Sequence, residues 1–312
     1  MLLKRLTNLK SMNSLLDLQT KDEKGVYEIE KSDLILSAII GIGDPLREGV
    51  KEAIAKCQRA QIKVRMITGD NLGTGREIAR EAGILTPDGF AMEGVDFMQR
   101  IGGVVCKTCG TATCGCPRSK RDAKRLKKKL RVDTIGNAAE FDNIYPKLDV
   151  LARARPEDKY ALVVGLKERG YVVAVTGDGA NDAPALLKAD VGFAMGESGT
   201  QIAQEASDIV IMDDNISSIV QAVVWGRNVY DNIRKFLQFQ LTINVSAVTI
   251  IAIGAIVSST PVFTPVQLLW INLVMDTLAS LALAAEDPNE DVLNRPPHSR
   301  RDKIISNVKF NK

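Results

Sequence analysis

The stretch that decides the fold is Thr176-Gly-Asp-Gly-Ala-Asn-Asp182, which directly follows the β-branched run 171–175. A shorter motif, Thr68-Gly-Asp70, stands in the same position after the run 63–67. Helical patterns follow both motifs, and strands that alternate with helices are typical of a parallel sheet with helices on both faces. Loops between such strands and helices lie at the carboxyl edge of the sheet, where ligands bind. The sequence therefore predicts a doubly wound α/β domain with both motifs at one edge.

The α/β pattern is expected to cover residues 34–216. The composition, 45% apolar and 25% charged, fits a globular chain. The stretch at about 94–145 is rich in Gly, Cys and basic residues and is expected to be an insertion. Residues 1–33 complete no unit and are expected to be the tail of a preceding domain. The other expected elements are strands at 36–42, 191–194 and 209–212 and helices at 48–60, 74–82, 156–169, 182–189 and 200–206.

The residue types of the two motifs suit a phosphoryl group with magnesium. Threonine hydroxyls and glycine-loop amides match phosphate oxygens, and the carboxylates of Asp178 and Asp182 match Mg²⁺, which prefers oxygen ligands. The alternative is that Gly-Asp pairs merely form turns, which is the commoner explanation for an isolated Thr-Gly-Asp but not for the seven-residue run.

A lysine lies between the two motifs in the sequence. Lys159 follows Pro156, which is typical of the first position of a helix, so its ammonium group could reach the same site and stabilise charge on a phosphoryl group. The alternative is an ordinary exposed helix lysine.

Two long apolar segments, 236–257 and 262–285, contain no Lys or Arg, and each is long enough to cross a bilayer. A helix that begins near Ser217 is expected to run into the first, giving a stalk and helical hairpin over 217–286. Basic residues on both sides of the hairpin place its ends, and the loop 287–312, in the cytoplasm.

Polar side chains inside these segments are candidate ion ligands. Asn272 and Asp276 share one helix face, and Asn244 lies in the other segment. Oxygen ligands of this kind suit calcium, whereas the alternative for the two asparagines is hydrogen bonding between helices.

The expected insertion carries two unusual features. Its four cysteines, Cys106, Cys109, Cys114 and Cys116, could close an S4 zinc site, the alternatives being a redox-sensitive or an accidental Cys-rich loop. Residues 118–131 hold nine Lys and Arg against one Asp. A helix that binds calmodulin or acidic lipid is conceivable there, but a solvated charged segment is favoured because aromatic anchors are missing. The confinement of this charge to one tract argues against nucleic-acid binding.

The motifs together resemble those of the P-type ATPases, over most of the chain from residue 34 apart from the insertion. The motifs in the order of that family are Gly43-Asp-Pro-Leu-Arg47, the stretches 66–71 and 175–182, and Ala189-Asp-Val-Gly-Phe-Ala-Met-Gly196. Three further motifs most resemble the plasma-membrane-type calcium pumps: Trp225-Gly-Arg-Asn-Val-Tyr-Asp231, Lys235-Phe-Leu-Gln-Phe-Gln-Leu241 and Leu269-Trp-Ile-Asn-Leu-Val-Met-Asp276.

This resemblance implies a haloacid-dehalogenase-like phosphorylation domain that uses Mg²⁺ and ATP, and roles for individual residues. Asp178, with Asp182, would hold magnesium. Asn244, Asn272 and Asp276 would ligate calcium on the fifth and sixth transmembrane helices. The candidate catalytic residues are Thr68, Gly69, Asp70, Lys159, Asn181 and Asp182, of which the first four would also contact the aspartyl phosphate or the cofactor.

The implied function is ATP-driven export of calcium from the cytosol by an integral membrane protein of the plasma membrane or an internal calcium store. The Asp-Lys-Thr-Gly segment of the family is absent from this sequence, and residues 1–33 would be the tail of a missing nucleotide-binding domain, so the chain alone is expected to be inactive. Two alternatives are a membrane-tethered phosphatase of the haloacid dehalogenase class and a non-catalytic partner of a full-length pump.

Overall fold

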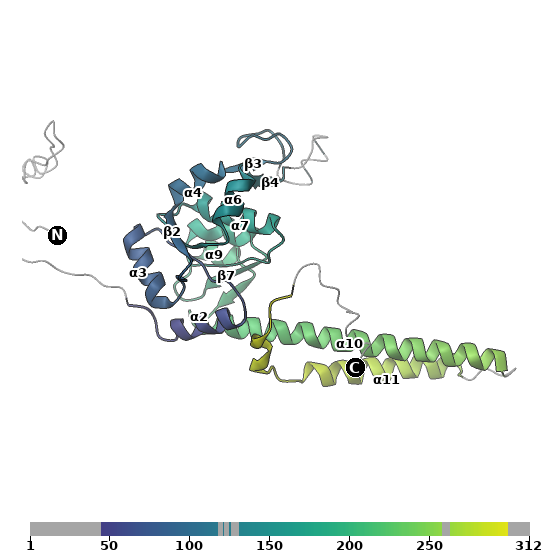
Figure 1. Ribbon diagram of the computed structural model, residues 1–312. Coiled ribbons are helices and arrows are strands. Elements are labelled where there is room, and N and C mark those ends of the chain that lie inside the picture. Colours follow the sequence, from purple (N-terminus) through teal and green to yellow (C-terminus); the bar gives the residue numbers. More distant parts are fainter. Residues whose placement is uncertain (1–44, 118–120, 122–124, 126–130, 258–262, 299–312) are drawn as a thin grey trace, which may run out of the picture. The chain divides into compact units, whose positions relative to one another are not determined.

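The computed structural model describes residues 45–117, 121, 125, 131–257 and 263–298 (Figure 1). Several sequence-based expectations lie outside these residues. They are the tail 1–33, the strand at 36–42, Gly43 and Asp44, most of the basic run, most of the connection between the apolar segments, and the end of the chain from 299.

One parallel sheet is built around a fully buried strand. Strand β5 (Leu148–Ala152) pairs on one side with β1 (Met66–Ile67) and on the other with β2 (Phe90–Glu93). Helix α3 (Leu72–Ala82) follows β1, and its N-cap Asn71 accepts a hydrogen bond from the Thr74 amide. The strand expected at 63–67 is thus confined to its last two residues.

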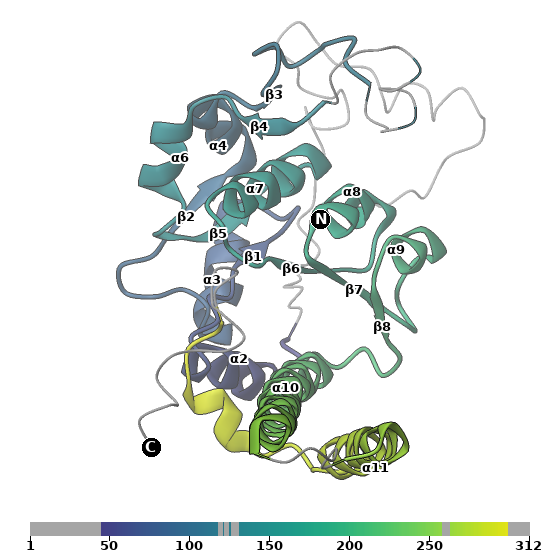
Figure 2. The ribbon, with the colours of Figure 1, turned by 90° about the vertical axis from the view of Figure 1, so that its right-hand side faces the viewer.

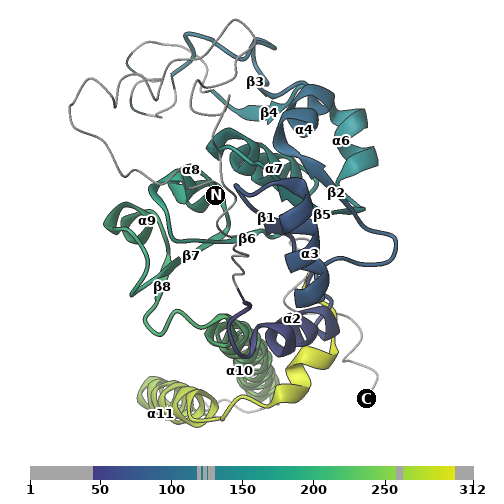
Figure 3. The ribbon, with the colours of Figure 1, turned by 90° about the vertical axis from the view of Figure 1, so that its left-hand side faces the viewer.

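A second parallel sheet has the order β6-β7-β8, formed by Ala174–Gly177, Val191–Met195 and Ile209–Ile211. Helices α8 (Ala183–Lys188) and α9 (Gln201–Glu205) connect its strands. The strand expected at 171–175 begins later, because the positive-φ turn at Gly170 leaves Tyr171 and Val172 exposed. Among the described residues, the single expected sheet is therefore present as two three-stranded sheets in an α/β fold. In Figures 2 and 3, β1 is the strand of the first sheet that lies nearest the second sheet, and β6 is the strand of the second sheet that lies nearest the first.

Both ends of the expected insertion contribute to the core. Helix α4 (Gly94–Ile101) buries Phe97, and helix α6 (Ala138–Ile144) buries Phe141 against helix α7 (Pro156–Glu168). Between α4 and α6, β3 (Val104–Cys106) pairs antiparallel with β4 (Asp133–Ile135). Of the expected insertion, the described residues between β3 and β4 therefore lie largely outside the core.

The long helix expected from near Ser217 is present as one element. Helix α10 (Ile216–Val257) has 42 residues, which corresponds to about 63 Å, and α11 (Pro265–Ala284) has 20. Both are long and apolar enough to cross a membrane. Helix α11 begins with a capping box between Thr264 and Gln267 and Pro265 in its first turn.

The base of α10 packs against two short elements, α2 (Val50–Arg59) and the 3-10 helix η3 (Glu290–Asn294). Ala53, Ala60, Val220, Val224 and Leu293 form a small apolar cluster between them. The segment after α11 is thereby joined to the base of the long helix.

Candidate functional site

The first motif forms a tight turn at the end of β1. The Thr68 amide donates to the Leu151 carbonyl (2.9 Å), which continues the sheet, and the Thr68 hydroxyl donates to an Asp70 carboxylate oxygen at 2.9 Å. The amide of Asp70 in turn donates to the Thr68 hydroxyl oxygen (3.1 Å). Gly69 and Asp70 are exposed, so this motif presents its polar groups to solvent just before α3.

The second motif follows β6 and folds back on it. The 3-10 turn Ala180–Asp182 (η2) leads directly into α8. A Cβ at Gly177 would lie 2.5 Å from the Cβ of Asp182, so only glycine permits this approach of the turn to the strand end. Asp182 is buried, whereas Asp178 and Asn181 are exposed.

Lys159 joins the second motif through an ion pair. Its Nζ lies 2.6 Å from Asp182 Oδ1, and the two side chains are only 19% and 10% exposed. Pro156 sets the start of α7, and Asp158 accepts a hydrogen bond from the Arg155 amide, which orients the first turn that carries Lys159. The positive charge of Lys159 thus offsets the negative charge of a carboxylate that is almost removed from water.

The site is therefore distributed over two loops and one helix. Lys159 and Asp182 are in direct contact, while Thr68, Gly69 and Asp70 lie at the edge of the other sheet. Because Asp182 is occupied by the lysine, Asp178 is the carboxylate of this motif with oxygens accessible to a cation. The side chains present fit a magnesium ion and an anionic phosphoryl group.

In the apolar helices, one of the three candidate ion ligands has an unsatisfied buried oxygen. Asp276 Oδ1 is shielded from solvent and has no hydrogen-bond partner among the described residues. Asn244 and Asn272 are exposed. A buried carboxylate oxygen without a donor fits a cation ligand, since leaving it unpaired is costly.

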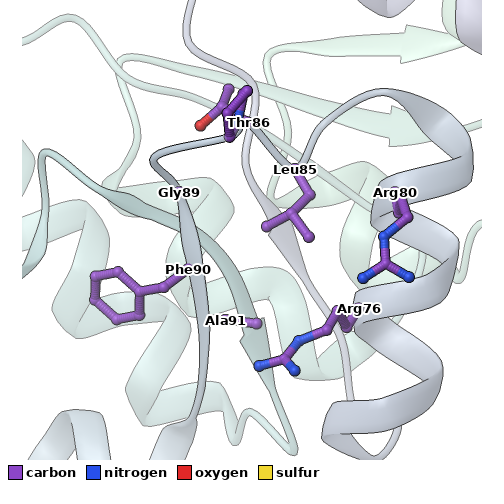
Figure 4. A pocket seen from close by; sticks show the side chains of 8 residues that line it. Arg76, Arg80, Leu85, Thr86, Gly89, Phe90 and Ala91 are labelled. Carbon is purple, nitrogen blue, oxygen red and sulfur yellow. The ribbon is translucent and has the colours of Figure 1, made fainter.

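A separate surface pocket lies between α3 and β2 (Figure 4). Arg76 and Arg80 lie on its α3 side, and Thr86 and Phe90 belong to its other wall, with the Phe90 ring turned away from the arginines. None of the residues expected in the phosphoryl site lines this pocket.

The chain was compared with known proteins. A family model described as "Cation transporting ATPase, C-terminus" matches residues 260–310. The chain is 51% identical over 276 residues to plasma membrane calcium-transporting ATPase 1 of Mus musculus, which covers 86% of this chain and 20% of that protein. It is 46% identical over 294 residues to calcium-transporting ATPase 8, plasma membrane-type, of Arabidopsis thaliana, which covers 93% of this chain and 24% of that protein.

The chain matches a segment of the P-type calcium-transporting ATPases. It spans between a fifth and a quarter of the length of the curated relatives described above. A solved zinc-transporting PIB-type ATPase in an E2.Pi state aligns with a TM-score of 0.49 and 24% identity, over 81% of this chain and 28% of that one. With its two apolar helices, this calcium-ATPase segment is part of an integral membrane protein.

Asp214 is a buried residue of this segment that the sequence did not predict as part of a site. Its buried carboxylate accepts hydrogen bonds from the backbone amides of Gly196, Glu197 and Ser198, at 2.8, 3.1 and 2.8 Å. Hydrogen bonds from Ser198, with those from the neighbouring amides, lower the pKa of Asp214. Asp214 therefore fixes the loop at the carboxyl end of β7. The only local signal was an Asp-Asp pair after a strand, which is also common in turns.

A second group that sequence analysis missed lies at the base of α10. The buried guanidinium group of Arg227 donates to the carbonyls of Ala60, Val292 and Arg295 at 2.8–2.9 Å. The sequence places Arg227 next to an apolar segment, where a basic residue is expected to lie at the membrane surface, so its burial had no local signal.

Proposed function

We propose that this chain is part of an ATP-driven pump that moves calcium out of the cytosol through an aspartyl-phosphate intermediate. The observation that carries the proposal is the 51% identity over 276 residues with a plasma membrane calcium-transporting ATPase. The plasma membrane or an internal calcium store would house the pump, with the α/β part in the cytoplasm.

We further propose that the two parallel sheets belong to one doubly wound domain of the haloacid dehalogenase type. Strands β1 and β6 each pair with one neighbour among the described residues, so each has an edge open to a further strand. A strand that carries the phosphorylated aspartate, supplied by another part of the pump, would fit these edges. It would bring the aspartate close to the motifs that follow β1 and β6.

In this site, each side chain has a separate role. The Lys159 ammonium group, held by Asp182, would supply a fixed positive charge for the phosphoryl oxygens. The Thr68 hydroxyl and the Gly69 amide would donate hydrogen bonds to them, and Asp70 would orient the Thr68 hydroxyl. Asp178 would hold the magnesium ion, whose charge stabilises the transferred group, and Asn181 would support the loop.

Transport requires the ion site to respond to phosphorylation. Asp276, with Asn272 on the same helix and Asn244 on α10, would contribute calcium ligands, and helices outside this chain would supply the rest of a shell of about six to eight oxygens. Since α10 is one uninterrupted helix from the end of the α/β part to Asn244, it would transmit a movement of its base to the ion site.

The test uses the pump that contains this chain, in membrane vesicles. Asp276→Asn should abolish calcium-dependent phosphorylation by ATP but preserve phosphorylation by inorganic phosphate in the absence of calcium. Asp178→Asn should abolish both, because magnesium is needed in each direction. The exposed Asp287, beyond α11, is the matched control, and Asp287→Asn should behave as wild type. Unchanged calcium dependence in Asp276→Asn would refute the ion-site assignment.

A further inference from the structure

Four cysteines, from the end of β3 and the connection that follows it, converge at one point. The Sγ atoms of Cys106, Cys109, Cys114 and Cys116 all lie within 4.8 Å of one another, and all four thiols are free. In a tetrahedral zinc site with Zn–S bonds of about 2.3 Å, the sulfurs are about 3.8 Å apart. The observed separations therefore require only small side-chain adjustments to enclose an ion.

The backbone around the first two cysteines is shaped for this convergence. Cys106 is buried at the end of β3, and its carbonyl accepts a hydrogen bond from the Gly110 amide at 2.7 Å. The Cys106 amide donates to the Thr111 carbonyl at 3.0 Å, which closes the turn. Gly110 has φ of +71°, a conformation that strongly favours glycine. The chain thus folds back so that Cys106 and Cys109 point to the same place.

A partly buried arginine supports the sulfur cluster from the other end of the connection. The Arg131 guanidinium lies 3.7 Å from Cys114 Sγ and donates to the Ala112 carbonyl at 3.0 Å. Its backbone amide donates to the Pro117 carbonyl, and its Nε pairs with Asp133 at 2.6 Å. Four thiolates around one Zn²⁺ carry a net charge of −2, which a neighbouring arginine would partly balance.

We propose that Cys106, Cys109, Cys114 and Cys116 bind one Zn²⁺ ion in a closed structural site. All four sulfurs approach one another, rather than forming two separate pairs as two disulfides would. Four soft sulfur ligands with no open position favour zinc over the hard cations of the transport reaction. This site is independent of the proposed calcium transport.

The metal would supply stability that this connection lacks. Among the described residues between β3 and β4, Pro117 is the only buried one, so apolar burial contributes little there. Zinc would fix the connection onto the β3–β4 pair, which is joined to α7 by a hydrogen bond from Tyr160 to Asp133 at 2.7 Å. The site therefore anchors a segment attached to the helix that carries Lys159.

The experiment uses the full chain, purified in detergent without added metal. Elemental mass spectrometry should find about one zinc per chain, and cobalt substitution should give the visible bands of a tetrahedral thiolate complex. Cys109→Ser changes an exposed ligand and should lower the zinc content to less than about half an equivalent. Cys57→Ser changes a cysteine outside the cluster and should leave it unchanged.

Three results would overturn the proposal. One is a folded wild-type chain without zinc that takes up no cobalt, and another is a mass four hydrogens lower, which shows two disulfides. The third is iron at the same sulfurs. If Cys109→Ser does not fold, the cobalt spectrum of the wild-type chain and its loss on adding a chelator still decide the question.

Discussion

Replacing Arg227 with methionine tests whether the base of α10 is held by one buried guanidinium group. Arg227 is 9% exposed, and its guanidinium group donates to three carbonyls, those of Ala60, Val292 and Arg295. Hydrogen bonds from a charged donor contribute about 1.5–3 kcal/mol each, but the released carbonyls can regain water when η3 opens. We therefore expect the local opening free energy to fall by about 3 kcal/mol, which is roughly a 100-fold loss of protection.

Hydrogen exchange of the chain in nanodiscs measures this directly. The informative amides are those of Ile62, which donates to Cys57, and of Val292, which donates to Asn289. Arg227→Lys retains the positive charge but loses the planar guanidinium group with its several donors. In this variant, the amides of Ile62 and Val292 should therefore exchange at rates between those of wild type and Arg227→Met. The exposed Arg76 on α3 provides the control Arg76→Met. Wild-type protection in Arg227→Met would refute this reasoning.

Two further predictions concern the core. In Gly165→Ala, the new methyl would overlap the buried ring of Phe141, so urea unfolding should show a loss of about 1–3 kcal/mol despite the better helix propensity of alanine. Adding Phe141→Leu should restore part of the lost stability. An unchanged or higher urea midpoint for Gly165→Ala alone would contradict the close contact between Gly165 and Phe141. Burial opposes ionisation of Asp149, but hydrogen bonds from Thr86 and the charge of Lys63 lower its pKa. The ionised carboxylate of Asp149 should therefore stabilise the fold above its unfolded pKa of about 4, and this stabilisation should be lost as the pH falls through its lower folded pKa. In Asp149→Asn, the free energy of unfolding should fall less steeply with decreasing pH in the acid range. An equally steep fall would contradict this prediction.

Elements with strong local signals were predictable from the sequence. Pro156 marks the observed start of α7, and the apolar pattern after Ser217 gave α10 to within one residue of its start. The sequence also predicted that Lys159 could reach the site of the second motif, and the structure places its ammonium group against Asp182 of that motif.

The central strand β5 was not predicted, because its sequence, Leu-Asp-Val-Leu-Ala, includes an aspartate. Asp149 is tolerated in the core because the Thr86 amide and hydroxyl, 63 residues away, donate to it and Lys63 pairs with it at 2.9 Å, and no local pattern reveals these partners. Helices α4 and α6 were hidden for a similar reason. Phe97 and Phe141 meet across a Cys-rich basic segment that dominates the composition of the region.

The polar contacts along α10 bear on the proposed coupling between phosphorylation and the ion site. Asn228 and Asn232 donate to the carbonyls of Glu286 and Leu283, and Lys235 pairs with the Glu286 carboxylate at 2.6 Å. These residues lie on one helix face, so they bind the end of α11 to the lower half of α10. A displacement of the α10 base would therefore move the end of α11 with it. Asp276 lies two turns before that end, so the two helices would carry their candidate calcium ligands together rather than slide past each other.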